Sequence, residues 1–235
     1  ARLGRRFSGE AVTFGLSPWA AVRAERIELS ARGAAFDLVL EDSPRRVRSP
    51  LPGLHNVYNL LAAAALAVRL GVPRSAIRRA VPRLRLPPMR WETFRAGGAL
   101  IVNDAYNANP ASMRAALAAF RALPVSGKRI VVSGDMNELG PFAPREHRRW
   151  GAELAEAAFD RLVFVGELSR DAAEGALRAG AGRGAVVRCP DRSAALAALA
   201  GAVGAGDAVL IKGSRIMSLD ELAERLVERL GRKRR

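Results

Sequence analysis

The most informative stretch of this chain for its fold is a polar one, Asp104-Ala105-Tyr106-Asn107-Ala108-Asn109-Pro110. It follows the apolar run 99–102, Ala-Leu-Ile-Val, and precedes an alanine-rich segment. This order predicts a strand, a polar turn and a helix. Asn109 is expected to cap the helix, with Pro110 in its first turn.

Three side chains of this stretch are candidates for a binding site. The prediction leaves Asp104, Tyr106 and Asn107 exposed at the carboxyl end of the strand, which is where open α/β sheets bind ligands. Asp and Asn are also ordinary turn formers, so a plain turn is the alternative interpretation.

The same order of strand and helix recurs along the rest of the chain. Five β–α units in succession predict an α/β fold with a mainly parallel sheet covered by helices. The predicted strands are 99–103, 129–133, 161–165, 185–189 and 208–212, and the predicted helices are 110–123, 145–158, 170–179, 193–203 and 219–230.

The first part of the chain follows another pattern. Alternating apolar residues over about 12–48 predict a strand meander or hairpin. Helices are expected at about 56–70 and 75–84, the second capped by Ser75. The proline pair 87–88 favours an extended connector, so we expect two domains, 1–88 and 89–235.

Composition limits the class of protein. The chain has 235 residues and a net charge of +15, and apart from three lysines its 38 basic residues are arginines scattered through every segment. This scatter argues against nucleic-acid binding, which favours a basic patch or stripe. No apolar run approaches the roughly 20 residues of a membrane helix, so no membrane insertion is expected. A single cysteine, Cys189, is expected to be buried and fits a reducing cytoplasm.

Two further polar loops follow predicted strands. Ser-Gly-Asp-Met-Asn-Glu-Leu-Gly at 133–140 carries Asp135 and Glu138, and Lys-Gly-Ser-Arg at 212–215 carries Lys212 and Ser214. Because the carboxyl ends of parallel strands share one edge, these loops are expected to converge with the loop at Asp104.

Two features precede the predicted sheet. Asn56 and Asn59 share one helical face and suit the edge of a purine, although Asn56 also suits a helix start. Arg90 suits a phosphate, although a solvated arginine is the default in so basic a chain. No Gly-x-x-x-x-Gly-Lys-Ser/Thr phosphate loop occurs in the sequence, so it predicts no complete ATP site.

Together these motifs resemble the Mur ligase family of peptidoglycan synthesis. The family's His-Asn-x-x-Asn helix is matched by 55–59, its interdomain arginine by Arg90, and the Asp of its first C-terminal loop by Asp104. Residues 106–110, the 134–140 turn with His147 downstream, and 212–215 resemble the branch that adds D-alanyl-D-alanine to UDP-N-acetylmuramoyl-tripeptide.

The resemblance implies a fold, a reaction and roles for residues. It implies the end of a central ATPase domain followed by a Rossmann-like C-terminal domain, and amide bond formation through an acyl phosphate with ATP and Mg²⁺. Arg90 and Asp104 are implied as catalytic. The implied nucleotide contacts are Asn56, Asn59, Arg90, Asp104, Tyr106 and Asn107, and the implied substrate contacts are Asn109, Asp135, Glu138, Lys212 and Ser214.

Other parts of the family pattern are expected upstream of Ala1, namely the UDP-binding domain, the phosphate loop and the magnesium ligands. The chain alone is therefore expected to be inactive, and no metal ligands are predicted within it. The alternatives are another Mur-type amide ligase, resembling the diaminopimelate-adding or folylpolyglutamate enzymes, and a nonenzymatic nucleotide-binding α/β partner subunit.

Overall fold

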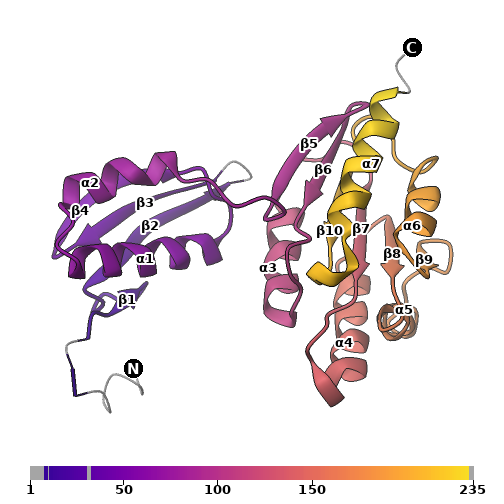
Figure 1. Ribbon diagram of the computed structural model, residues 1–235, viewed down its shortest axis with the longest axis horizontal. Helices are drawn as coiled ribbons and strands as arrows, with labels where there is room; N and C mark the ends of the chain where they lie inside the picture. The colour runs from indigo at the N-terminus through magenta and orange to yellow at the C-terminus, as the bar shows by residue number, and fades with distance from the viewer. Residues whose placement is uncertain (1–7, 10, 31–32, 233–235) are drawn as a thin grey trace. The chain divides into compact units, whose positions relative to one another are not determined.

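The computed structural model describes residues 8–9, 11–30 and 33–232. The chain divides into two compact units, residues 1–85 with 121–123 and residues 86–120 with 124–235. Figure 1 shows that each unit is built around its own sheet. The predicted α/β class is confirmed.

The sheet of the first unit is a short meander, as the sequence predicts. Its described strands lie in the order β1 (Phe14–Gly15), β2 (Val22–Ser30), β3 (Gly33–Leu40) and β4 (Ser43–Ser49). β1 runs parallel to β2, and β2, β3 and β4 pair antiparallel. The middle strand β3 is buried along most of its length, which fits its apolar sequence.

Two helices complete the first unit. Helix α1 (Leu54–Arg69) packs into the core through residues that include Val57 and Leu61, and it confirms the predicted helix. The second predicted helix is shorter than expected. Helix α2 (Arg74–Ala80) continues only as the 3₁₀ turn η2 (Val81–Arg83), because Pro82 has no N–H for an α-helical bond. The expected cap at Ser75 is wrong, since Pro73 stands at the N-cap.

The second unit contains all five predicted parallel strands. β5 is antiparallel to β6 at one edge, and the other neighbouring pairs are parallel. Its described strands lie in the order β5 (Glu92–Ala96), β6 (Ala99–Asn103), β10 (Ala208–Lys212), β7 (Arg129–Gly134), β8 (Arg161–Val165) and β9 (Val186–Cys189).

Helices cover both faces of this sheet. α6 and α7 supply apolar side chains to one core with the strands, while α3 and α4 lie across the opposite face (Figure 1). The predicted helices are confirmed with shifted ends: α3 (Pro110–Arg121), α4 (Ala143–Glu156), α5 (Ser169–Arg178), α6 (Arg192–Leu199) and α7 (Leu219–Arg232). Short 3₁₀ turns, η3 (Gly140–Phe142) and η4 (Arg215–Met217), precede α4 and α7.

Helices α4 and α5 approach each other through glycine. A Cβ atom built on Gly151 of α4 would lie 1.8 Å from the carbonyl oxygen of Ala172. One built on Gly175 of α5 would lie 2.0 Å from the carbonyl oxygen of Arg148. The close packing of these two helices therefore requires the absence of a side chain at both positions.

The strand order brings three loops together. β10, the last strand in the sequence, lies between β6 and β7. Ile211 pairs with Asn103 on one side, and Lys212 pairs with Ser133 on the other. The loops that follow these three strands therefore start side by side at the carboxyl edge of the sheet, as predicted.

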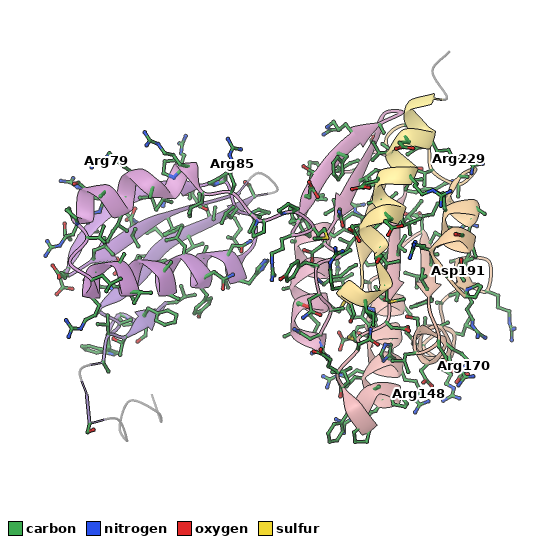
Figure 2. The ribbon with its side chains drawn as sticks, in the orientation of Figure 1. Arg79, Arg85, Arg148, Arg170, Asp191 and Arg229 are labelled. Carbon is green, nitrogen blue, oxygen red and sulfur yellow. The ribbon has the colours of Figure 1, made fainter. Side chains whose placement is uncertain are left out.

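Basic side chains project from many elements of both units. In Figure 2, Arg79 and Arg85 lie at the surface of the first unit, and Arg170 and Arg229 lie at the surface of the second. Among the described residues, no helix is both long enough and apolar enough to cross a membrane.

Candidate functional site

The turn at Asn109 begins helix α3 as the sequence predicts. The Oδ1 of Asn109 accepts a hydrogen bond from the backbone N–H of Ser112 at 2.9 Å, and the Oγ of Ser112 accepts one from the N–H of Asn109 at 3.1 Å. Pro110 is the first helical residue. This reciprocal cap fixes where the polar loop ends.

Asp104 is the one member of the loop whose predicted exposure is wrong. Its side chain is only 17% exposed, because Oδ1 accepts from the N–H of Trp91 at 3.0 Å and Oδ2 from the Nζ of Lys212 at 2.7 Å. Tyr106 and Asn107 are exposed as expected. The sequence shows no sign of these two bonds, because the partners lie 13 and 108 positions away and meet Asp104 only in the folded chain.

Arg90 lies beside this loop. Its guanidinium carbon is 4.2 Å from the centre of the Tyr106 ring, and the residue is exposed. The backbone N–H of Tyr106 also donates to the carbonyl of Met89 at 3.1 Å. A stacked guanidinium of this kind keeps its N–H donors available to an anion.

Sequence reasoning missed two residues that hold the same segment. Glu92 accepts bonds through Oε2 from the N–H of Met89 at 3.2 Å and from the Nδ2 of Asn103 at 3.3 Å. The available signal was the polar Asn103 at the end of an apolar strand. Its partner belongs to β5, which the sequence did not predict.

The loops after β7 and β10 interlock. The N–H of Ser214 donates to the carbonyl of Asp135 at 3.0 Å, and the N–H of Asn137 donates to the Oγ of Ser214 at 2.9 Å. Asp135 is buried, and its Oδ1 accepts from the N–H of Ser169 at 2.6 Å. Glu138 is exposed. The two predicted loops thus form one framework that presents Glu138 to solvent.

His147 supports this framework from α4. Its Nδ1 lies 2.7 Å from the carbonyl oxygen of Ala143, and its Nε2 accepts the N–H of Met136 at 3.0 Å. These partners assign the ring proton to Nδ1. His147 is therefore a buried support for the 134–140 turn.

The amide pair of the first unit lies at the start of α1. Asn56 is buried and donates through Nδ2 to the carbonyl of Pro52 at 2.8 Å. Asn59 is exposed and donates to the Oδ1 of Asn56 at 3.4 Å. Asn59 therefore presents the accessible amide of this pair.

Among the residues that the structure describes, the side chains do not form a metal site. Across residues 8–9, 11–30 and 33–232, no three His, Cys, Asp or Glu side chains gather closely enough to hold a metal ion. The Asp135 carboxylate is used as a helix cap, and the Asp104 carboxylate pairs with a lysine. These residues do not fit a magnesium site.

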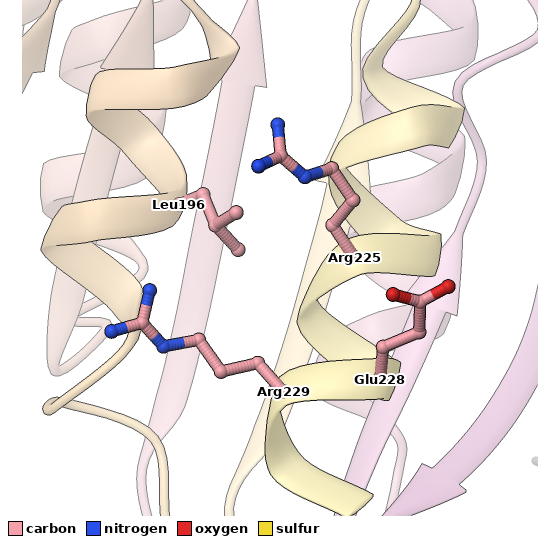
Figure 3. Close-up of a pocket in the computed structure, with 4 residues that line it drawn as sticks. All are labelled: Leu196, Arg225, Glu228 and Arg229. Atoms are coloured by element: carbon pink, nitrogen blue, oxygen red, sulfur yellow. The ribbon is translucent and has the colours of Figure 1, made fainter. Parts of the chain in front are cut away.

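A surface groove lies elsewhere on the second unit. Figure 3 shows Arg225 and Arg229 reaching from α7 toward Leu196 of α6, with Glu228 beside them. Arg225, Glu228 and Arg229 lie beyond the first turn of α7, away from the edge where β10 ends and α7 begins. None of the predicted site residues lines this groove.

The second unit is thus a doubly wound α/β domain with a polar rim at the carboxyl edge of its sheet, a class that binds ligands at that edge. Comparison with known proteins identifies the family within this class. A family model described as "Mur ligase, glutamate ligase domain" matches residues 89–215, and the Mur ligase middle domain matches residues 2–67. The chain belongs to the Mur ligase family.

Relatives with one function recur among the similar proteins. The UDP-N-acetylmuramoyl-tripeptide–D-alanyl-D-alanine ligase of Bacillus subtilis is 35% identical over 76% of this chain, and that of Escherichia coli is 33% identical over 87%. The crystal structure of MurF from Acinetobacter baumannii covers 92% of this chain and 47% of its own, at 32% identity and a TM-score of 0.82. The chain spans 39% and 44% of the lengths of the two ligases.

Proposed function

We propose that the protein containing this chain is an ATP-dependent ligase that joins D-alanyl-D-alanine to UDP-N-acetylmuramoyl-tripeptide. The observation that carries the proposal is the single rim formed by the loops after β6, β10 and β7. Those loops carry the sequence features that resemble the D-alanyl-D-alanine-adding branch, and the similar ligases bear that name.

The two parts of the chain are assigned to two domains of such a ligase. Residues 1–88 are proposed as the end of the central ATP-binding domain, and residues 89–235 as the C-terminal domain. The matches at 2–67 and 89–215 support this division.

ATP is the proposed nucleotide. Arg90 is assigned to its phosphates, which is supported by an exposed guanidinium held on the face of Tyr106. Asp104 is assigned to the ribose, with Tyr106 and Asn107 beside it. Asn56 and Asn59 are assigned to the adenine, and the exposed amide of Asn59 offers both a donor and an acceptor to a base edge.

The dipeptide is assigned to the interlocked loops. Asn109, Asp135, Glu138 and Ser214 stand at or beside the carboxyl edge of the sheet. Glu138 is the exposed carboxylate of this framework and suits the ammonium group of an incoming dipeptide. Asp135 and Ser214 hold the framework in shape through their hydrogen bonds.

The proposed reaction needs positioned cations more than a covalent nucleophile on the protein. A carboxylate oxygen of the tripeptide attacks the γ-phosphorus of ATP, and the bond to the ADP oxygen breaks. The neutral amine of the dipeptide then attacks the acyl carbon, phosphate leaves with the electron pair of the broken C–O bond, and the nitrogen gives up one proton, which the leaving phosphate takes. In the first step negative charge accumulates on phosphoryl oxygens, where an arginine such as Arg90 stabilises it.

The test is substrate-dependent release of ADP by the full-length protein. With ATP, magnesium and UDP-N-acetylmuramoyl-tripeptide, release is expected with D-alanyl-D-alanine and not with diaminopimelate or L-lysine. Release with UDP-N-acetylmuramoyl-dipeptide plus diaminopimelate would instead make the protein the sibling that adds the third residue. The chain of 235 residues assayed alone is expected to be inactive, because its sequence contains no phosphate loop.

A further inference from the structure

The ammonium group of Lys212 is fully used inside the second unit. Lys212 is the last residue of β10, and its side chain is only 5% exposed. Its Nζ lies 2.7 Å from the Oδ2 of Asp104, 3.3 Å from the carbonyl oxygen of Asp104 and 3.0 Å from the carbonyl oxygen of Asn107. A lysine has three N–H donors, and here each has an acceptor.

Because all three donors of the Lys212 ammonium are used within the protein, we do not expect Lys212 to contact a substrate. The resemblance to Mur ligases assigns Lys212 to the dipeptide pocket, where it would have to donate to a ligand. A buried ammonium is stable only with its partners in place, and releasing one of them to reach a ligand would leave a buried carboxylate or carbonyl unpaired. These hydrogen bonds favour a structural role for Lys212, in which it binds other residues of the protein.

The second carboxylate oxygen of Asp104, Oδ1, connects Lys212 to the segment that contains Arg90. Its Oδ1 accepts the backbone N–H of Trp91. Trp91 has a φ of 53° and Met89 a φ of 61°, so a left-handed residue stands on each side of Arg90. Such conformations cost free energy in residues other than glycine and persist only when the surroundings hold them.

The 89–91 segment also contacts the 104–107 loop through Tyr106. The N–H of Tyr106 donates to the carbonyl of Met89, while the Tyr106 ring lies under the guanidinium of Arg90. Lys212 also binds the carbonyl of Asn107, the residue after Tyr106. One ammonium therefore holds both the carboxylate that fixes Trp91 and the loop that carries the aromatic platform.

We propose that Lys212 is a positioning residue, which holds Asp104 and the 104–107 loop so that the strained 89–91 turn presents Arg90 on Tyr106, and that it does not bind the dipeptide. Its effect on catalysis depends on the proposed ligase function. Its effect on the structure of the 89–91 turn does not.

The structural test is amide hydrogen exchange of the 235-residue chain, measured by NMR. In Lys212→Met, the Trp91 and Tyr106 amides should exchange at least about tenfold faster than in the wild type, with little change in strand amides of β8. Lys128→Met is the matched control, because Lys128 is exposed and precedes β7 at the opposite edge of the sheet. It should leave the exchange rate of both amides unchanged.

Three outcomes of this structural test would overturn the proposal. The first is unchanged exchange of the Trp91 and Tyr106 amides in Lys212→Met. If that variant does not fold, Lys212→Gln takes its place. Its side chain is shorter, uncharged and has only two donors, so it cannot make all three bonds of Lys212, and unchanged exchange there counts equally. Failure of both variants to fold would make Lys212 a support of the whole unit instead of one turn.

A kinetic test separates the two roles in the full-length protein. Lys212→Met is expected to raise the KM for ATP about tenfold and to leave the KM for D-alanyl-D-alanine within about twofold. A selective rise in the KM for the dipeptide would overturn the proposal. If the wild-type protein does not use the dipeptide at all, the proposed function fails, while the exchange measurement still decides the role of Lys212.

Discussion

At the scale of single residues, the rim divides into side chains that hold the loops and side chains that face solvent. Asp135 and Ser214 are buried and bonded within the second unit, whereas Tyr106, Glu138 and Arg90 are exposed. Residue type alone does not separate these groups, since each contains polar or charged residues. Ligand contacts are therefore best sought first among the exposed members.

Arg90→Lys tests the geometry of the exposed guanidinium. Lysine keeps the charge but loses the planar fork and the stacking on Tyr106, so the KM for ATP of the full-length ligase should rise about tenfold. The measurement is steady-state ADP release at varied ATP. Arg95→Lys, at an exposed position of β5, is the control and should behave as the wild type. An unchanged KM in Arg90→Lys would contradict the assignment.

Cys189 provides a test of burial at the end of β9. Burial raises the pKa of its thiol, and the nearby carboxylate of Asp191 raises it further. A raised pKa lowers the thiolate fraction at pH 8, so alkylation by iodoacetamide should be at least about tenfold slower in the native chain than in urea. Equal rates in the two states would show that the thiol is accessible.

At the scale of elements, helices α4 and α5 pack so closely that the contact has no room for a side chain at Gly151. Gly151→Ala would place a methyl group against the backbone of Ala172 and should lower the free energy of unfolding by about 1–3 kcal/mol. Gly231→Ala, near the end of α7, meets nothing within 4 Å and should leave stability unchanged or raise it by up to about 1 kcal/mol. Urea denaturation of the three proteins makes the comparison, and similar midpoints for both variants would contradict the packing described here.

The sequence predicts most elements of the second unit because each apolar strand is followed by a helix of clear periodicity. It does not predict β5, whose residues Glu-Thr-Phe-Arg-Ala carry two charges and lie at the sheet edge. It places Asp104, Asp135 and Lys212 at the rim correctly. It does not show that Asp135 is bonded to a residue 34 positions away, or Asp104 to one 108 positions away, because those bonds depend on the strand order.

At the scale of the whole molecule, each unit has a hydrophobic core of its own. We therefore expect residues 86–235, expressed alone, to fold. A single cooperative urea transition and dispersed amide NMR signals would confirm this. A fragment without a cooperative transition would show that the second unit depends on the remainder of the chain.

The order of the second sheet also bears on how the chain is made. β10 is synthesised last, yet it lies between β6 and β7, which are complete about 75 residues earlier in the chain. A growing chain at that stage carries two unpaired strand edges, and such edges pair readily with other chains. We therefore expect the sheet of the second unit to be completed only after β10 has been synthesised.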